Sequence, residues 1–142
     1  MSASPVRAVV DKERAAQSTD SNGNVVIRAL KERDGQCFKF SLLGLIETYD
    51  AGMRDITLVH GVITGYHRDR VEPGHEMRIA HAWLERGDTV YDATVDVLFH
   101  KDDFYQMVAA VAERRYTAEE AMLNRFLFST VGPWHKTAGV FT

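Results

Sequence analysis

The chain has one cysteine, no surplus of positive charge and no long hydrophobic run, and each of these shortages excludes a class of protein. Cys37 is alone among 142 residues, so an intrachain disulfide is impossible and a cysteine-rich structural zinc site is excluded. The formal net charge is -3, which gives no electrostatic case for binding nucleic acid. No stretch approaches the roughly 18 apolar residues of a membrane span, and charges interrupt residues 11–14, where a signal peptide would be apolar. We therefore expect a cytoplasmic protein without membrane contact.

What is present is an ordinary globular composition, 45% hydrophobic and 26% charged. A chain of this length suits one domain and can bury a core without disulfides. We divide it into a polar N-terminal arm, residues 1–24, and a single domain, residues 25–142. Four histidines, His60, His67, His75 and His81, are separated by seven, eight and six positions, which fits no compact metal-binding motif. We expect neither a metal nor a cofactor.

The hydrophobic periodicity predicts an α+β domain with a small antiparallel sheet. We expect helices over 25–33, 37–49, 102–115 and 117–128, strands over 55–64, 77–86 and 89–95, and a loop over 17–24. Small residues recur along the helix at 37–49, which allows it to lie close to the sheet. Gly87-Asp88 is the signal of a two-residue hairpin. The expected architecture is a cysteine-bearing helix packed on this sheet, with further helices towards the C-terminus.

Cys37 is predicted at the first turn of its helix, directly after Asp34-Gly35-Gln36. A free cysteine is most often a buried apolar residue. A helix N-terminus, however, carries partial positive charge and unpaired N–H groups, which stabilise a thiolate and can hold an oxyanion. The surroundings of Cys37 must decide between these interpretations.

The hairpin permits a geometric test of those surroundings. If Gly87 and Asp88 form the loop, Trp83 is opposite Asp92, and His81 and Asp92 are diagonal neighbours on one face of the sheet. A three-residue loop would instead separate them. With the two side chains within reach, Cys37 is the candidate nucleophile, His81 the general base and acid, and Asp92 the residue that orients the imidazole.

Four further residues are candidates for other roles at this site. Gln36 is an oxyanion donor by adjacency alone. Trp83 and His60 are candidates for substrate contact, although core packing is the commoner role for a strand tryptophan or histidine. Asp96 competes with Asp92 as the third member of the triad but lies beyond the hairpin.

The run His81-Ala82-Trp83-Leu84-Glu85, then Gly87-Asp88, then Val90-Tyr91-Asp92-Ala93-Thr94 resembles the His–Asp hairpin of the transglutaminase-like branch of papain-like cysteine enzymes. Gln36-Cys37-Phe38 occupies the nucleophile's position in that resemblance, which covers roughly residues 35–96. It implies a papain-like fold and thiol acyl-enzyme chemistry on a protein or peptide-like amide.

The function that we expect is therefore a cysteine peptidase or amidase. Two alternatives remain open at this point: an acyltransferase or transglutaminase with the same triad, and a non-catalytic binding module on a degenerate papain-like fold. The sequence indicates no oligomeric state.

Overall fold

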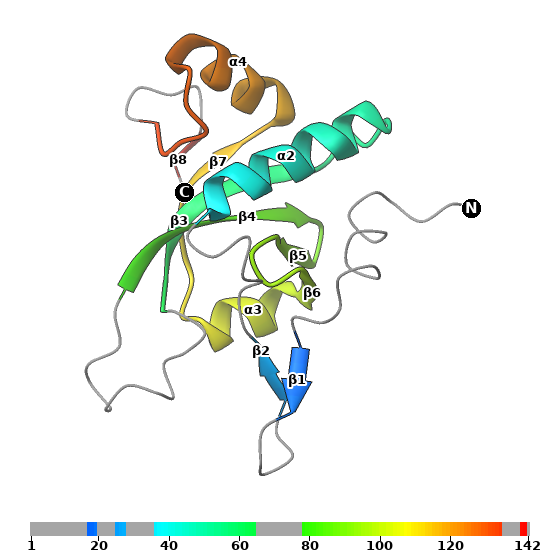
Figure 1. The fold of residues 1–142 in the computed structure, drawn as a ribbon, viewed down its shortest axis with the longest axis vertical. Coiled ribbons are helices and arrows are strands. Elements are labelled where there is room, and N and C mark those ends of the chain that lie inside the picture. The colour runs from blue at the N-terminus through cyan, green and yellow to red at the C-terminus, as the bar shows by residue number, and fades with distance from the viewer. Residues whose placement is uncertain (1–16, 20–24, 28–35, 65–77, 135–139, 142) are drawn as a thin grey trace.

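In the computed structural model, the chain has a small α+β fold. The structure describes residues 17–19, 25–27, 36–64, 78–134 and 140–141, and the side chains of 36–64 and 78–134. One antiparallel sheet runs in the order β6-β5-β4-β3-β7-β8, and β1 pairs with β2 separately. The strands are β1 (Gln17–Thr19), β2 (Val25–Ile27), β3 (Thr57–Thr64), β4 (Arg78–Arg86), β5 (Thr89–Asp92), β6 (Val97–His100), β7 (Val111–Tyr116) and β8 (Val140–Phe141). The helices are α2 (Cys37–Asp50), α3 (Lys101–Met107) and α4 (Ala118–Phe128) (Figure 1).

The predicted hairpin between β4 and β5 is confirmed in register as well as in place. Arg86 pairs with Thr89, so Gly87 and Asp88 form a loop of two residues. Gly87 has a φ of 56°, the left-handed conformation that such a tight turn needs and that glycine adopts without strain.

The helix predicted to begin at Cys37 is also confirmed, and small residues let it lie close to β4. A Cβ atom added at Gly44 would stand 3.3 Å from Leu84 Cδ1, and the Ser41 hydroxyl donates to the carbonyl oxygen of Ala82 at 3.1 Å. Figure 1 shows α2 running across β3 and β4 on one side of the sheet. A larger side chain at position 44 would push the helix away.

Alternate residues of the central strands serve two hydrophobic clusters, one on each face of the sheet. Leu58, Ala82, Leu84 and Tyr91 pack with Leu42 and Leu45 of α2. Val59, Ile63, Trp83 and Val90 pack with Phe104 of α3. The period of two along β3 and β4 is what divides the side chains between these clusters. His81, which precedes Ala82 and is two residues before Trp83, points to the face of α3.

The prediction of one helix over residues 102–115 is wrong. α3 ends at Met107, Ala109 takes a left-handed φ of 48°, and Val111–Tyr116 becomes β7, paired with β3. The chain reverses at a residue that carries a side chain, so no glycine or proline indicated the break. Pairing with the exposed edge of β3 then outweighs the helical propensity of this alanine- and glutamate-containing segment.

Two other element predictions need correction. The strand predicted over 89–95 ends at Asp92, because residues 93–96 form a turn closed by the Asp96 amide, which donates to the Asp92 carbonyl at 2.8 Å. Residues 17–19, predicted as loop, and 25–27, predicted as the start of a helix, are instead the paired strands β1 and β2. The remainder of those two predicted segments lies outside the described residues.

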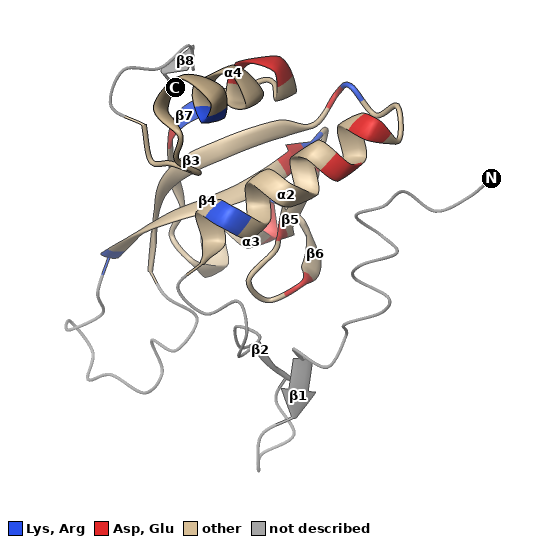
Figure 2. Cartoon of the chain, turned by 45° about the horizontal axis from the view of Figure 1, so that its top comes forward, with Lys and Arg blue, Asp and Glu red and all other residues tan. Residues whose placement is uncertain are grey.

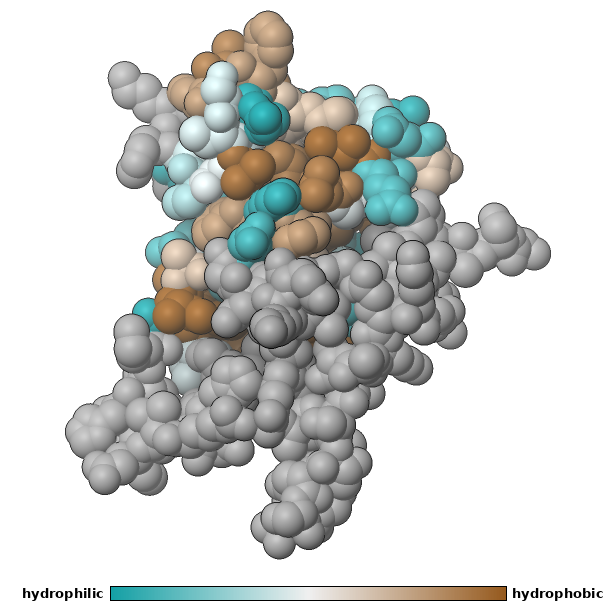
Figure 3. All heavy atoms as spheres, viewed as in Figure 1, coloured by the Kyte–Doolittle hydropathy of each residue, from teal (hydrophilic) through white to brown (hydrophobic). Residues whose placement is uncertain are grey.

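The predicted last helix is confirmed as α4, with the Thr117–Glu120 capping box formed in both directions. Its far end is apolar and exposed, with Phe126 80% exposed and Leu123, Leu127 and Phe128 also exposed. Figure 3 shows hydrophobic residues gathered over α2 and α4. No helix among the described residues is both long and apolar enough to cross a membrane.

Candidate active site

His81 on β4 and Asp92 at the end of β5 form a buried hydrogen-bonded pair. His81 Nε2 lies 2.6 Å from Asp92 Oδ2, and the two residues are 5% and 0% exposed. The β4–β5 register puts them on one face, as the hairpin loop of two residues requires. Since Nε2 faces Asp92, Nδ1 is the ring nitrogen left to meet a nucleophile.

The Asp92 carboxylate is held in position by its own turn. Its Oδ1 accepts from the backbone N–H of Thr94 at 3.0 Å and from the Thr94 hydroxyl at 2.7 Å, which leaves Oδ2 for His81. Asp96, the competing candidate, is buried in the same turn, where its Oδ1 accepts from the Tyr91 hydroxyl. It is Asp92, therefore, that is bonded to His81, while Asp96 is bonded to Tyr91.

Cys37 reaches His81 because α2 begins where the edge of β4 is uncovered. β5 pairs with β4 only from Leu84 to Arg86, and beyond that point Ser41 of α2 takes up the Ala82 carbonyl. Cys37 lies one turn before Ser41 on the same side of the helix. Its side chain is hydrogen-bonded to His81 and is 8% exposed.

The charge on His81 follows from these neighbours. Burial alone would lower the pKa of the imidazole, but the Asp92 carboxylate and the hydrogen bonds with Asp92 and Cys37 outweigh burial and raise the pKa to about 10. At neutral pH the ring is therefore an imidazolium, with a carboxylate on one side and the sulfur of Cys37 on the other.

The start of α2 adds to the positive potential at Cys37. Gln36 is the exposed N-cap residue, its side chain caps none of the backbone N–H groups, and the first turn has no acidic residue. That turn holds Lys39, while Glu47 and Asp50 lie at the other end of the helix (Figure 2). This charge order opposes the helix dipole, which costs some helix stability and concentrates positive potential at the N-terminus.

Trp83 and Glu85 continue the face of β4 on which His81 lies. The Trp83 ring is stacked beside His81, with centroids 6.1 Å apart, and is fully buried against Phe104. Its Nε1 donates to Glu85 Oε2 at 2.8 Å. The structure thus places Trp83 as a support behind His81, within the core rather than on an accessible surface.

Glu85 was not among the predicted site residues. It is 4% exposed, yet hydrogen bonds from Tyr105, Arg115 and Trp83 outweigh the effect of burial and keep its pKa below the ordinary value. Lys101 also lies 3.3 Å from its carboxylate. His81, Trp83 and Glu85 alternate along β4, and this spacing was the one sequence signal that could have placed Glu85 on the same face of the sheet as His81.

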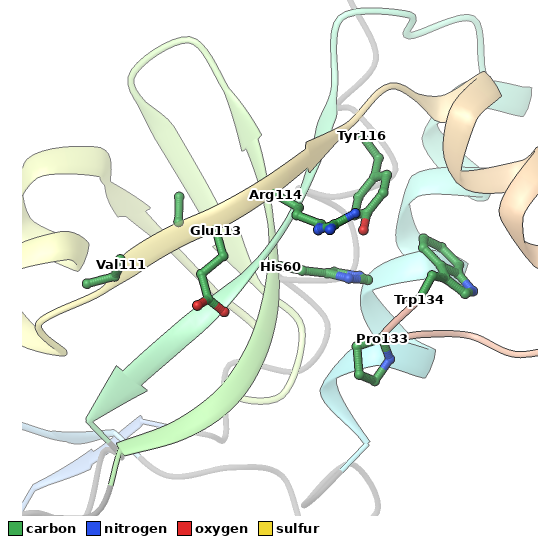
Figure 4. Close-up of a pocket in the computed structure, with 8 residues that line it drawn as sticks. His60, Val111, Glu113, Arg114, Tyr116, Pro133 and Trp134 are labelled. Atoms are coloured by element: carbon green, nitrogen blue, oxygen red, sulfur yellow. The ribbon is translucent and has the colours of Figure 1, made fainter. Parts of the chain in front are cut away.

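His60 does not join the other candidates. It pairs with Ala82, whereas His81 pairs with Gly61, so the two histidine side chains leave the sheet on opposite faces. The His60 ring lies between Phe38, Tyr116 and Trp134, with centroid separations of 4.7, 4.9 and 5.2 Å. It lines a separate cavity (Figure 4).

The assembled groups are therefore the sulfur of Cys37, the imidazolium of His81 and the carboxylate of Asp92, at a helix N-terminus. Such a set can form and break an acyl–sulfur bond. Within the part of the chain that the structure describes, no three His, Cys, Asp or Glu side chains are placed to hold a metal ion. No family model, curated protein or solved structure matches the chain.

Proposed function

We propose that the protein is a thiol-dependent hydrolase, a cysteine peptidase or amidase, that works through a covalent acyl-enzyme on Cys37. The observation that carries this proposal is the buried 2.6 Å contact between His81 Nε2 and Asp92 Oδ2, with Cys37 hydrogen-bonded to the same imidazole. A buried histidine that serves only packing would not need a carboxylate on one nitrogen and a thiol beside the ring.

The reaction follows from the charges. The Cys37 thiolate attacks the carbonyl carbon of an amide, forming a C–S bond and placing negative charge on the oxygen. We assign the stabilisation of that charge to the backbone N–H groups at the start of α2, which no side chain caps, with the Gln36 side chain as a second donor.

Breakdown then needs a proton and, later, a water. The His81 imidazolium donates its proton to the leaving nitrogen as the C–N bond breaks, and an amine departs. The neutral ring next takes a proton from water, whose oxygen attacks the acyl carbon and breaks the C–S bond. A carboxylic acid leaves, and the thiolate–imidazolium pair is restored.

The same proposal includes a papain-like core of the transglutaminase-like kind. It is supported by the order of the groups along the chain: Cys37 opens a helix, and His81 and Asp92 follow on adjacent strands of one antiparallel sheet. A peptide-like amide is the substrate class that suits this chemistry.

The decisive experiment is mass spectrometry of the chain after incubation with an activated acyl ester. The expected result is a single acyl adduct on Cys37, which is lost over time in water and is absent in Cys37→Ala. His81→Gln should slow its formation by about a hundredfold or more, whereas the exposed His100 offers a matched control, His100→Gln, that should leave the rate unchanged.

Adding a primary amine separates hydrolysis from acyl transfer. Release of free acid in the presence of the amine supports the hydrolase, and preferential formation of the new amide would make the protein an acyltransferase with the same three residues. If Cys37 is not acylated, and its alkylation by iodoacetamide proceeds equally fast in the wild type and in His81→Gln, the catalytic proposal is wrong.

A further inference from the structure

A second site lies on the other face of the sheet from His81. The cavity has a volume of about 450 Å³ and is lined by His60 of β3, by residues along β7 and by Pro133 and Trp134 of the following tail. That volume falls in the range of small-molecule pockets, about 300–1,000 Å³. Val111, Glu113 and Pro133 are exposed, so the cavity opens to solvent between them.

The inner wall of this cavity holds polar groups without partners. His60 is 5% exposed and Tyr116 0%, yet His60 Nδ1, His60 Nε2 and Tyr116 Oη have no hydrogen-bond partner among the described residues. Buried polar atoms are nearly always satisfied, and an unsatisfied one is costly. Two such side chains, from two different strands, meet at one cavity (Figure 4).

The charge beside these groups is positive. The Arg114 guanidinium lies next to the Tyr116 hydroxyl and over the His60 ring (Figure 4), and its field is strong enough to act on His60 together with burial. The Glu113 carboxylate points away from Arg114 and Tyr116 (Figure 4). Among the described residues, Phe38 and Trp134 also contact the His60 ring and Pro133 lines the same cavity, and none of these three titrates.

The remaining walls are flat and apolar. The Trp134 ring lies 5.2 Å from His60 at an interplanar angle of 32°, and Tyr116 stands edge-on to Trp134. Walls of this kind favour a planar hydrophobic group over an extended polar one.

We propose that this cavity binds a small organic anion, a carboxylate attached to a flat apolar group, with His60 and Tyr116 donating hydrogen bonds to the carboxylate. Arg114 provides the favourable potential, whatever its own hydrogen-bond partners are. The ring of the ligand lies against Trp134 and Pro133. The site is separate from Cys37 and does not depend on the proposed hydrolase activity.

Binding of such an anion is linked to the protonation of His60. The pKa of His60 is lowered to about 4 by burial and by Arg114, so the ring is neutral at neutral pH and has one N–H to donate. A bound carboxylate favours the protonated ring, with two donors. Affinity should therefore rise as the pH falls from about 7 towards 5, by up to about tenfold per pH unit.

The test uses 3-phenylpropanoate as the probe and its neutral counterpart 3-phenylpropanamide, titrated calorimetrically into the full chain. We expect the carboxylate to bind at least about ten times more tightly than the amide. Tyr116→Phe should lower the affinity for the carboxylate probe by about fivefold or more. His60→Phe should lower this affinity further and remove its dependence on pH. Arg114→Gln should also lower the affinity for the carboxylate probe, and Arg114→Lys should lower it much less.

Matched controls keep the outcome decisive. Tyr49→Phe removes a hydroxyl from the C-terminal end of α2, away from the cavity, and Cys37→Ala removes the thiol of the other candidate site. Both variants should bind the probe as the wild type does. Because Tyr116 Oη has no hydrogen-bond partner among the described residues, Tyr116→Phe should fold normally. No binding of the carboxylate, equal affinity for acid and amide, or an unchanged affinity in Tyr116→Phe would each overturn the proposal.

Discussion

His60 and His81 are buried histidines on adjacent strands, and their surroundings drive their pKa values in opposite directions. His81 has a carboxylate at 2.6 Å and becomes a stable cation. His60 has aromatic rings and a guanidinium nearby and stays neutral. The residue type is the same at both positions, so burial alone cannot predict charge, and the neighbouring charges decide it.

Replacement of the Asp92 carboxylate by an amide isolates the electrostatic effect of Asp92 on His81. Asp92→Asn keeps a side-chain oxygen for Thr94 but removes the charge that raises the pKa of His81. We expect kcat/KM for an activated ester to fall about a thousandfold. The exposed turn residue Asp88 provides the control, Asp88→Asn, which should retain full activity. Equal activity in both variants would contradict a role for Asp92.

Replacement of His60 tests whether its nitrogens are truly unsatisfied. In His60→Phe an apolar ring enters a space already bounded by Phe38, Tyr116 and Trp134, and two buried polar atoms disappear. We expect the free energy of unfolding at pH 7 to rise by about 1–2 kcal/mol, measured by urea denaturation. A loss of stability of that size would mean that the two nitrogens are satisfied in solution.

At the scale of elements, the helices and strands that sequence patterns predicted well are those with local signals. Three features depend only on adjacent or regularly spaced residues: the Gly87-Asp88 turn, the capping box of α4 and the row of small residues along α2. Two reversals were missed because Asp96 and Ala109 take left-handed φ values of 55° and 48° without being glycine. Only the surrounding fold can impose such conformations on these residues.

The candidate site divides in the same way. The proximity of His81 and Asp92 could be predicted from the hairpin alone, because the length of its loop determines that both side chains lie on the same face of the sheet. Glu85 could not, because the groups that hold its charge come from α3 and β7, far along the chain. The prediction of one helix over residues 102–115 also conceals that Tyr105 and Arg115 both donate to the Glu85 carboxylate.

The charge order along α2 gives a prediction in which stability and reactivity move in opposite directions. Lys39→Glu places an acid in the first turn, where the helix dipole favours it, and should raise the free energy of unfolding by about 0.3–1 kcal/mol. The same acid opposes a thiolate at Cys37, so iodoacetamide should react several times more slowly.

Comparison with Lys39→Gln separates the loss of the lysine from the gain of the acid. The neutral variant should fall between the wild type and Lys39→Glu in both urea denaturation and alkylation rate. If Lys39→Glu reacts as fast as the wild type, the field of the α2 N-terminus does not govern the thiol.

For the molecule as a whole, the two histidines predict a stability maximum near neutral pH. The pKa of His60 is depressed in the folded state, so stability is lost as the pH falls from about 6.5 towards 4. The pKa of His81 is raised, so its contribution is complete below about 6.5 and is lost as the pH rises towards 10.

Urea denaturation at a series of pH values measures both limbs on the same protein. His60→Phe should flatten the acid limb above pH 4.5, where Glu85 is still ionised, and leave the alkaline limb intact. His81→Gln should flatten the alkaline limb and leave the acid limb intact. An alkaline limb that survives in His81→Gln would show that another group controls it.

β4 belongs to both faces of the sheet, since Ala82 and Leu84 pack toward α2 while His81, Trp83 and Glu85 point toward α3. Neither cluster can come apart without exposing residues of this one strand, and β3 and β5 flank it on both sides. Subglobal opening should therefore be suppressed here. The amide protons of Leu84 and Glu85 should exchange with deuterium only through global unfolding, whereas those at the apolar end of α4 exchange through local fraying.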